Sequence, residues 1–312
     1  MRASFATLFF CVCFDSVISE LWTNISTEGQ FLKQHQFRDP NLPQHNARVP
    51  AKGIAYQISS HGPLMALTPY NNLIFYTPES KEWEIEMEAV ISVSSCADGT
   101  IWSITKVFDQ SAIFRNQHLN PPQEVPNDIN GTLKQIYGQD ANHAVVLTEN
   151  GKIFVFSDGK SWNLVSDGKL FRAQQVVLGD SDDGKVLYAL DTNGTLWVGR
   201  FTQNVDWVQV NVLITPTNVI GGKMPVMFGG RPLAAFDVFS STGGKSILAA
   251  ANARGNLYLS QISKGSVDLQ EQDTPKEGCI FVSLNANQLY CITPDQDIFV
   301  KDIPAKFKAS NG

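Results

Sequence analysis

The sequence predicts an all-β protein, a six-bladed β-propeller whose last blade is closed by a strand from the N-terminus. Three observations predict it: one short pattern recurs six times, most copies are about 40 residues apart, and the sixth copy lacks an outer strand. The chain has 312 residues, 43% hydrophobic and 17% charged, which is enough apolar surface for a large core.

The recurring pattern is a turn, one variable residue, and then Ile or Leu followed by an aromatic residue. The pairs are Ile74-Phe75, Ile113-Phe114, Ile153-Phe154, Leu196-Trp197, Leu257-Tyr258 and Ile298-Phe299. Successive pairs are 39, 40, 43, 61 and 41 residues apart. The long interval contains a Gly-rich stretch at 221–232, which is typical of a surface loop. Four short strands per interval match a propeller blade better than a solenoid or a sandwich.

Each copy predicts a β-hairpin between an apolar strand before the turn and the Ile/Leu-aromatic strand after it, and a leading strand and a Trp-led outer strand complete the unit. Asn150-Gly151 and Asn193-Gly194 favour the positive-φ turn of such a hairpin. Neighbouring side chains on a strand point to opposite faces, so the Ile or Leu and the aromatic residue need cover on both sides, which stacked blades provide. We expect blades at approximately 51–88, 89–130, 131–170, 171–214, 215–277 and 278–312.

The N-terminal segment supplies the outer strand that the sixth copy lacks. The run ELWTNISTEGQFLKQ at 20–34 resembles KSWNLVSDGKLFRAQ at 160–174, so Trp22 takes the position that Trp162 holds in the third copy. We therefore expect residues 20–37 to close blade six and hide a sheet edge. Residues 38–50 would connect this strand to blade one.

Residues 1–19 have the pattern of a secretory signal peptide. Arg2 precedes an apolar run that ends at Phe14, and the segment suits cleavage before Glu20. This pattern predicts a secreted, extracellular protein. The alternative is that residues 6–19 form a buried strand pair in a cytoplasmic protein. No stretch has the length and apolar character that predict a membrane span.

Cleavage would leave three cysteines, Cys96, Cys279 and Cys291. They allow at most one intrachain disulfide, and their spacing is not that of a metal site. Simple burial in strands is the other interpretation of these side chains. A secreted chain would also offer three sequons for N-linked glycans, which are Asn24, Asn130 and Asn193.

The stretch from residue 130 to 179 resembles two consecutive tectonin repeats. It shows the pattern Gly-x-Leu-Lys-Gln-Ile, an apolar strand, Gly-x-Ile-Phe and Trp-x-x-Val, and the match is good over roughly 130–210. Tectonin-like propellers include fish egg lectins and tachylectin-type lectins that bind lipopolysaccharide. The resemblance therefore implies a secreted, six-bladed, glycan-binding protein of innate immunity. Blades two and five depart from it, with PPQEVPNDI and VDLQEQ in place of the Trp-led strand.

The run HAVVLTENGKIFVF also resembles a repeat of the regulator-of-chromosome-condensation type. That resemblance implies a protein-interaction propeller with a longer repeat, and its Gly-rich signatures are missing here. The tectonin resemblance covers more of the chain.

We expect a binding protein rather than an enzyme. Its partners would be glycans or glycoconjugates, including bacterial lipopolysaccharide, bound at several weak sites whose contributions add. A sugar stacks its apolar face on an aromatic ring, which makes the outer-strand tryptophans the candidates. These are Trp22, Trp83, Trp162 and Trp207. Packing between blades is the alternative role of each ring, and a protein-interaction propeller or a propeller hydrolase is the alternative function.

Other chemistry finds little support in the sequence. The net charge of −6 and the lack of a basic patch argue against nucleic acid. FSDGKSW, STGGKS and GDSDDGK approach an Asp-box, a phosphate loop and a calcium loop, but their spacing fails. The five histidines (His35, His45, His61, His118 and His143) show no metal-ligand spacing. We expect no cofactor and no metal, while a carboxylate site assembled from several blades at the channel stays open.

Overall fold

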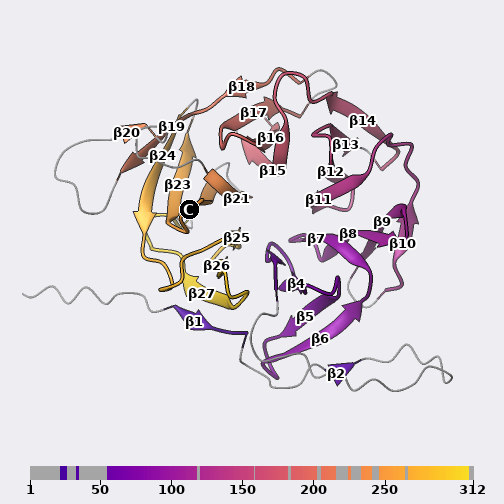
Figure 1. The fold of residues 1–312 in the computed structure, drawn as a ribbon, viewed down its shortest axis with the longest axis horizontal. Helices are drawn as coiled ribbons and strands as arrows, with labels where there is room; N and C mark the ends of the chain where they lie inside the picture. Colours follow the sequence, from indigo (N-terminus) through magenta and orange to yellow (C-terminus); the bar gives the residue numbers. More distant parts are fainter. Residues whose placement is uncertain are drawn as a thin grey trace, which may run out of the picture.

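The computed structural model describes residues 22–26, 33–34, 55–117, 120–157, 159–181, 184–201, 205–215, 224–225, 233–240, 246–263 and 266–308. Within these residues six sheets stand in a ring around a central channel (Figure 1). The described residues form strands, turns and links but no helix. The protein is a six-bladed β-propeller, which confirms the predicted fold class. The predicted signal peptide (1–19) and connector (38–50) lie outside the described residues. In the described part of the chain, no helix could cross a membrane.

The strands of each blade are ordered from the channel to the rim. Blade one holds β3 (Gln57–Ser59), β4 (Met65–Leu67), β5 (Leu73–Thr77), β6 (Glu82–Met87) and β2 (Lys33–Gln34). Blade two holds β7 (Val90–Ser95), β8 (Thr100–Val107), β9 (Gln110–Gln117) and β10 (Gln123–Val125). Blade three holds β11 (Leu133–Asp140), β12 (His143–Thr148), β13 (Ile153–Ser157) and β14 (Ser161–Ser166).

The other three blades follow the same order. Blade four holds β15 (Ala173–Ser181), β16 (Gly184–Asp191), β17 (Leu196–Arg200) and β18 (Val208–Gln209). Blade five holds β21 (Leu233–Ser240), β22 (Ser246–Asn252), β23 (Leu257–Ser263), β24 (Ser266–Gln272), β19 (Asn211–Thr215) and β20 (Met224–Pro225). Blade six holds β25 (Phe281–Leu284), β26 (Gln288–Ile292), β27 (Ile298–Asp302) and β1 (Thr23–Asn24).

The N-terminal strand closes the ring as predicted. β1 pairs antiparallel with β27, with Thr23 opposite Val300, and the Ile25 N–H donates to the Ile298 carbonyl at 2.9 Å. The segment predicted to close blade six also reaches blade one, because β2 pairs in parallel with β6. The N-terminal segment therefore covers sheet edges on both sides of the seam where the ring closes.

Blade five is larger than the sequence indicated. β19 spans the expected blade boundary at residue 214 and pairs in parallel with β24, so it extends the sheet of blade five rather than that of blade four. β20 lies within the predicted surface loop and pairs with β19. Two extra strands thus cover the outer edge of this blade.

The two side chains of each repeated Ile/Leu-aromatic pair face opposite sides of the sheet, as expected for neighbours on a strand. The Ile or Leu of every pair is buried, whereas the aromatic ring on the opposite face is half-buried in five pairs and buried only at Tyr258. The buried side of each hairpin packs against a neighbouring blade, as in the clusters that join Val145 and Val176 or Ile113 and Ile136. The core therefore lies between the blades.

Five of the six hairpins share one turn design, shown best by blade three. The Gly151 N–H donates to the Thr148 carbonyl at 2.9 Å, and the Lys152 N–H donates to Thr148 Oγ1 at 3.1 Å. Gly151 has a φ of 84°, while Asn150 keeps a negative φ, so only the glycine needs the left-handed region. Equivalent turns begin at Thr68, Asp191, Asn252 and Thr293.

Neighbouring blades are joined near the channel by polar side chains of the innermost strands, a set that we call the inner ring. Each side chain bonds to the main chain of the next innermost strand. The pairs are Gln57 with Val93, Ser92 with Ile136, Gln135 with Val176, Gln175 with Phe236, and Asp237 with Leu284. A net gain of about 0.5–1.5 kcal/mol is typical of each such bond. The glutamines of the innermost strands therefore help to fix how neighbouring blades align.

Candidate functional site

The four tryptophans predicted to bind ligand differ in exposure. Trp83 is 2% exposed and Trp162 is 6% exposed, whereas Trp22 and Trp207 are half-buried. A ring that stacks on a sugar must present a face to solvent. Trp83 and Trp162 thus have the packing role that the sequence left open as an alternative. Ligand contact by Trp22 and Trp207 stays a prediction.

Three of these indoles also link neighbouring blades, and we call them the outer ring. Each indole N–H donates to a main-chain carbonyl in or beside the fourth strand of the preceding blade, counted from the channel. The bonds are Trp22 to Asp273 at 3.1 Å, Trp83 to Ile25 at 3.2 Å and Trp207 to Val165 at 3.2 Å. The resemblance between the Trp22 and Trp162 segments therefore reflects one repeated structural position.

Trp162 is the exception in this set. Its Nε1 is buried and has no hydrogen-bond partner. The preceding blade is blade two, whose outer strand β10 has three residues in a Pro-rich segment. The ring instead packs against Phe156 and Trp102, with centroids at 5.1 and 6.2 Å.

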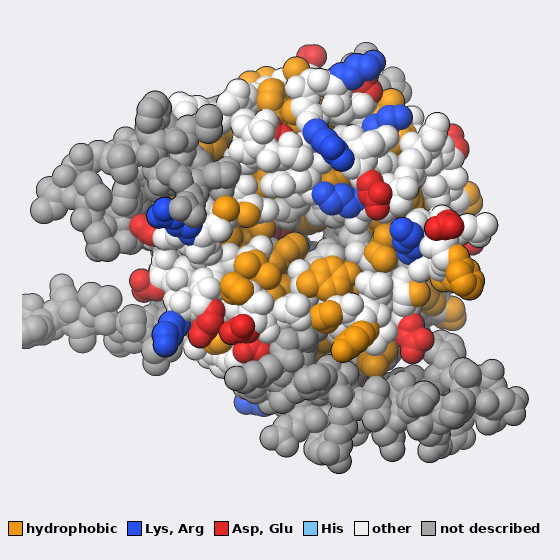
Figure 2. Space-filling view, viewed as in Figure 1, with side chains coloured by type: hydrophobic (Ala, Val, Ile, Leu, Met, Phe, Trp, Pro, Cys, Tyr) orange, Lys and Arg blue, Asp and Glu red, His pale blue; other side chains and the backbone are white. Residues whose placement is uncertain are grey.

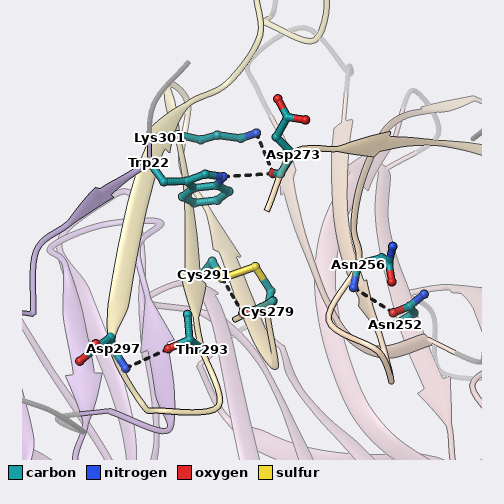
Figure 3. The surroundings of a disulfide bond; sticks show 10 residues. Trp22, Asn252, Asn256, Asp273, Cys279, Cys291, Thr293, Asp297 and Lys301 are labelled. Atoms are coloured by element: carbon teal, nitrogen blue, oxygen red, sulfur yellow. Dashed lines mark hydrogen bonds between the residues drawn. A yellow bond between two sulfur atoms is a disulfide. The ribbon is translucent and has the colours of Figure 1, made fainter. Parts of the chain in front are cut away.

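Trp22 lies beside the closing seam, as Figure 3 shows. The Lys301 ammonium stands 4.8 Å from its ring centroid and also donates to the Asp273 carbonyl at 3.2 Å. The disulfide between Cys279 and Cys291 staples the start of blade six to β26. Among the cysteines that the structure describes, Cys96 is free and buried.

The seam between blades three and four carries a second aromatic group. Phe171 stacks on Trp197 with centroids at 4.7 Å and an interplanar angle of 10°, and it meets Trp207 edge-on at 5.1 Å. Gly199 makes room for the segment that carries Trp207, because a Cβ there would clash with Val205 Cγ1 and would lie 3.2 Å from the indole. Trp197 is half-buried, like Trp207. Trp197 appeared in the repeated pattern, but sequence reasoning did not single it out as a site residue.

The centre of the ring holds a polar cluster that the sequence did not reveal. His61 Nε2 lies 3.0 Å from Asp237 Oδ2, which also accepts hydrogen bonds from Ser283 Oγ at 3.0 Å and from the Leu284 N–H. The Tyr137 hydroxyl lies 3.1 Å from His61 Nε2. These residues come from blades one, three, five and six, so no sequence spacing signals their contact.

The channel cluster has little free volume around it. Burial, followed by the nearby Asp237 carboxylate, raises the pKa of Tyr137 well above its usual range. The cavity lined by His61, Tyr137, Asp237 and the inner-ring glutamines has a volume of about 20 Å³, enough for about one water molecule. A histidine beside a carboxylate can move a proton, and the described residues leave room beside this pair for about one water molecule. In this structure the cluster ties four blades across the channel.

A second charged group lies between blades three and four. His143 Nδ1 is 2.8 Å from Asp140 Oδ1, and Lys185 Nζ is 2.7 Å from Gln139 Oε1. Burial raises the pKa of Asp140, but hydrogen bonds from Asn142 and His143 and the Lys185 charge outweigh it and lower the pKa overall. Within the described residues, no three His, Cys, Asp or Glu side chains are placed to hold a metal ion.

The three sequons lie in different surroundings. Asn130 and Asn193 are exposed, at the link into blade three and at a hairpin turn of blade four. Asn24 lies in the closing strand, and its Oδ1 accepts a hydrogen bond from the Ser26 N–H at 2.9 Å. Glycosylation at all three asparagines stays a prediction.

Comparison with known proteins establishes the fold class and nothing finer. No protein-family model and no curated protein matches the chain. BBS1N in complex with ARL6DN has a TM-score of 0.54 at 13% identity, covering 82% of this chain and 95% of that chain. Virginiamycin B lyase from Staphylococcus aureus has a TM-score of 0.51 at 11% identity, covering 84% and 83%. YCF48 bound to D1 peptide has a TM-score of 0.47 at 11% identity, covering 93% and 96%.

Proposed function

We propose that this chain is a secreted, non-enzymatic binding propeller of the tectonin-like class that recognises glycans at the seams between its blades. The observation that carries the proposal is the half-buried pair Trp197 and Trp207 around Phe171. Aromatic rings with one covered and one open side suit the apolar face of a sugar. Arg172 and Lys169 are exposed in the same link as Phe171 and supply hydrogen-bond donors.

The ring offers a second platform of the same kind at Trp22. β1, which follows Trp22, and β18, which follows Trp207, lie on different sides of the ring (Figure 1), so one molecule presents two separate seams to a glycan-bearing surface. Two weak sites on one rigid body bind such a surface more tightly than either alone. Lipopolysaccharide and branched glycans are therefore the ligand class that we favour.

Secretion is part of the proposal and rests on the N-terminal pattern together with the disulfide. A disulfide between Cys279 and Cys291 persists in oxidising compartments. Expression of the full chain in a secreting host tests this point. N-terminal sequencing of protein from the medium should find Glu20 as the first residue, whereas an uncleaved cytoplasmic chain would contradict secretion.

A glycan array and a lipopolysaccharide binding assay on the purified protein test glycan recognition. Trp197→Gln keeps a donor for Asp191 Oδ2, which the indole now bonds at 3.0 Å, but removes the ring face. We expect it to weaken binding about tenfold, the loss of one stacking contact of about 1–2 kcal/mol. Trp162→Phe, at a buried ring, is the matched control and should bind as the wild type does. A folded protein that binds no glycan would overturn the proposal.

A protein-interaction propeller is the second candidate. BBS1N, which has the same fold, was solved in complex with ARL6DN, and an exposed ring surface suits such a role. Wild-type binding to a protein ligand with an inert glycan array would favour this candidate over the first.

A further inference from the structure

Exposed apolar side chains concentrate on one face of the ring. This face, the turn face, comprises the hairpin turns 68–72, 108–109, 149–151, 192–194, 253–255 and 294–296 and the links 88–89, 126–132, 167–172 and 273–280. Main-chain hydrogen bonds join turn to link, as between Glu149 and Thr132 or Cys279 and Gly255. The described residues include seven exposed large hydrophobic side chains, of which Leu164 and Val208 lie on outer strands. The other five lie on or directly beside the turn face: Tyr70, Val107, Phe108, Leu170 and Ile280.

Blade two projects farther from this face than the other blades. Its ladder continues for two pairs beyond Thr105 and Ala112, to Val107 opposite Gln110, where blade three has already turned. At about 3.4 Å per residue the tip stands about 7 Å farther out. Val107 and Phe108 occupy this tip and are 56% and 93% exposed.

Phe108 is also held in an unfavourable backbone conformation. Its φ is 54°, a region that bulky side chains rarely adopt and that hairpin turns usually assign to Gly, Asn or Asp. Because the Phe108 side chain is almost fully exposed, no packing against the described residues offsets the strain. Strain and exposure at one residue, neither serving the fold, point to a function outside the fold.

The distribution and charge of the turn face indicate the partner. The apolar tips belong to several blades around the ring, so a flat, deformable surface meets them together. The exposed charged residues on this face are eight acidic (Glu88, Asp109, Asp128, Glu149, Asp167, Asp273, Glu277 and Asp295) and four basic (Lys169, Arg172, Arg254 and Lys276). This balance repels anionic headgroups. A choline headgroup, in contrast, is attracted by carboxylates and by the faces of Tyr and Phe rings.

We propose that the turn face docks on a zwitterionic phosphatidylcholine surface, with the Val107-Phe108 tip inserted among the lipids and Tyr70 at the headgroup level. Tyrosine suits that level because its ring is apolar and its hydroxyl is polar. Apolar insertion, rather than attraction between net charges, supplies the binding, so it resists salt. This contact needs no sugar. The link 167–172 belongs both to the turn face and to a seam site of the proposed function, but the inserted residues Val107 and Phe108 lie in blade two, outside the seam sites.

Flotation of the purified protein with vesicles of phosphatidylcholine alone tests the proposal. The wild type should float with the vesicles at both low and high salt, and more weakly with phosphatidylserine vesicles. Phe108→Asn removes the apolar tip and places a residue that tolerates the left-handed region, so it should bind about tenfold more weakly while unfolding at the same or a higher temperature. Leu164→Asn, an equal change on the outer strand β14, should bind as the wild type does.

Several outcomes would overturn the proposal. These are a wild type that stays in solution, a Phe108→Asn variant that floats as well as the wild type, or a preference for phosphatidylserine. Concentration-dependent self-association of the wild type that Phe108→Asn abolishes, without vesicle binding, would make the tip a protein contact instead. Because these vesicles contain no glycan, their result is independent of the glycan array.

Discussion

The inner and outer rings do the same task with different chemistry. Both join neighbouring blades by a bond from a side chain to a main-chain group. The inner ring uses amides, a hydroxyl and a carboxylate, and the amides and the carboxylate line a cavity with room for about one water molecule. The outer ring uses indoles, which range from 2% exposed at Trp83 to half-buried at Trp22 and Trp207.

That difference separates stability from function. An amide buried at the channel can satisfy its partner and do nothing more. An indole at the rim can hold the preceding blade with its N–H and still leave part of its ring in solvent. The face of the ring that Figure 2 shows has a similar division, with hydrophobic side chains around its middle and most charged ones farther out. New binding sites are therefore easier to build at the rim than at the axis.

Loss of the closing strand should have the largest effect, because it breaks the outer ring at two places. Deleting residues 20–34 removes the Trp22 indole and also the Ile25 carbonyl that Trp83 bonds. We expect loss of cooperative unfolding, or a fall in Tm of at least about 10 °C, by differential scanning calorimetry. A chain lacking only residues 1–19 is the control and should keep the Tm of the full chain. An unchanged Tm after the longer deletion would show that β1 does not hold the ring together.

A break in the inner ring should cost less than loss of the closing strand. Gln175→Leu leaves both the Phe236 N–H and its carbonyl without their side-chain partner in a buried place. We expect the free energy of unfolding to fall by about 2–4 kcal/mol in urea titrations. Gln135→Leu removes one such bond, to the Val176 N–H, and should cost about half as much. Equal losses in both variants would contradict this count of bonds.

The sequence predicted the fold because each blade is formed by short local sequence patterns that recur along the chain. The Ile/Leu-aromatic pair, the turn residues and the Trp-led strands each recur, and the likeness of the Trp22 and Trp162 segments gave the ring closure. The His61 and Asp237 contact shows the limit, since its partners are 176 residues apart and belong to no repeat. β19 on blade five and the apolar tip of blade two escaped prediction for the same reason, since each occurs once.

The site was predicted less well than the fold, again for a physical reason. Sequence placed a Trp at the start of the outer strand, but its exposure depends on which side chains pack around it, as Phe156 and Trp102 do around Trp162. Trp162 and Trp207 have the same sequence position, yet one is 6% exposed and the other half-buried. Only the packing of the folded propeller determines how far each tryptophan is exposed.

A smaller effect distinguishes a made outer-ring bond from a missing one. Trp83→Phe loses ring volume and also the N–H that bonds the Ile25 carbonyl. Trp162→Phe loses similar ring volume but no hydrogen bond, because its Nε1 has no partner. We expect Trp83→Phe to lower the free energy of unfolding by about 1 kcal/mol more than Trp162→Phe does. If Trp162→Phe is the more destabilising variant, the outer ring stabilises by packing alone.

The last prediction concerns buried tyrosines that stand between the two rings. Their replacement should leave the free energy of unfolding unchanged at pH 7 and alter it only in alkali. Burial, with a contribution from Asp180, raises the pKa of Tyr188 to about 12, and burial raises that of Tyr290 to about 12. In the unfolded chain both ionise near 10, so their contribution is fully present below pH 10 and is lost as pH rises through 12. Tyr188→Phe should unfold like the wild type at pH 7 but lose less stability between pH 10 and 12, by about 2–3 kcal/mol. Denaturant titrations across that range measure this. Parallel curves for the two proteins would mean that Tyr188 ionises in the folded ring as easily as in water, and that the space between the rings is wetter than the buried contacts indicate.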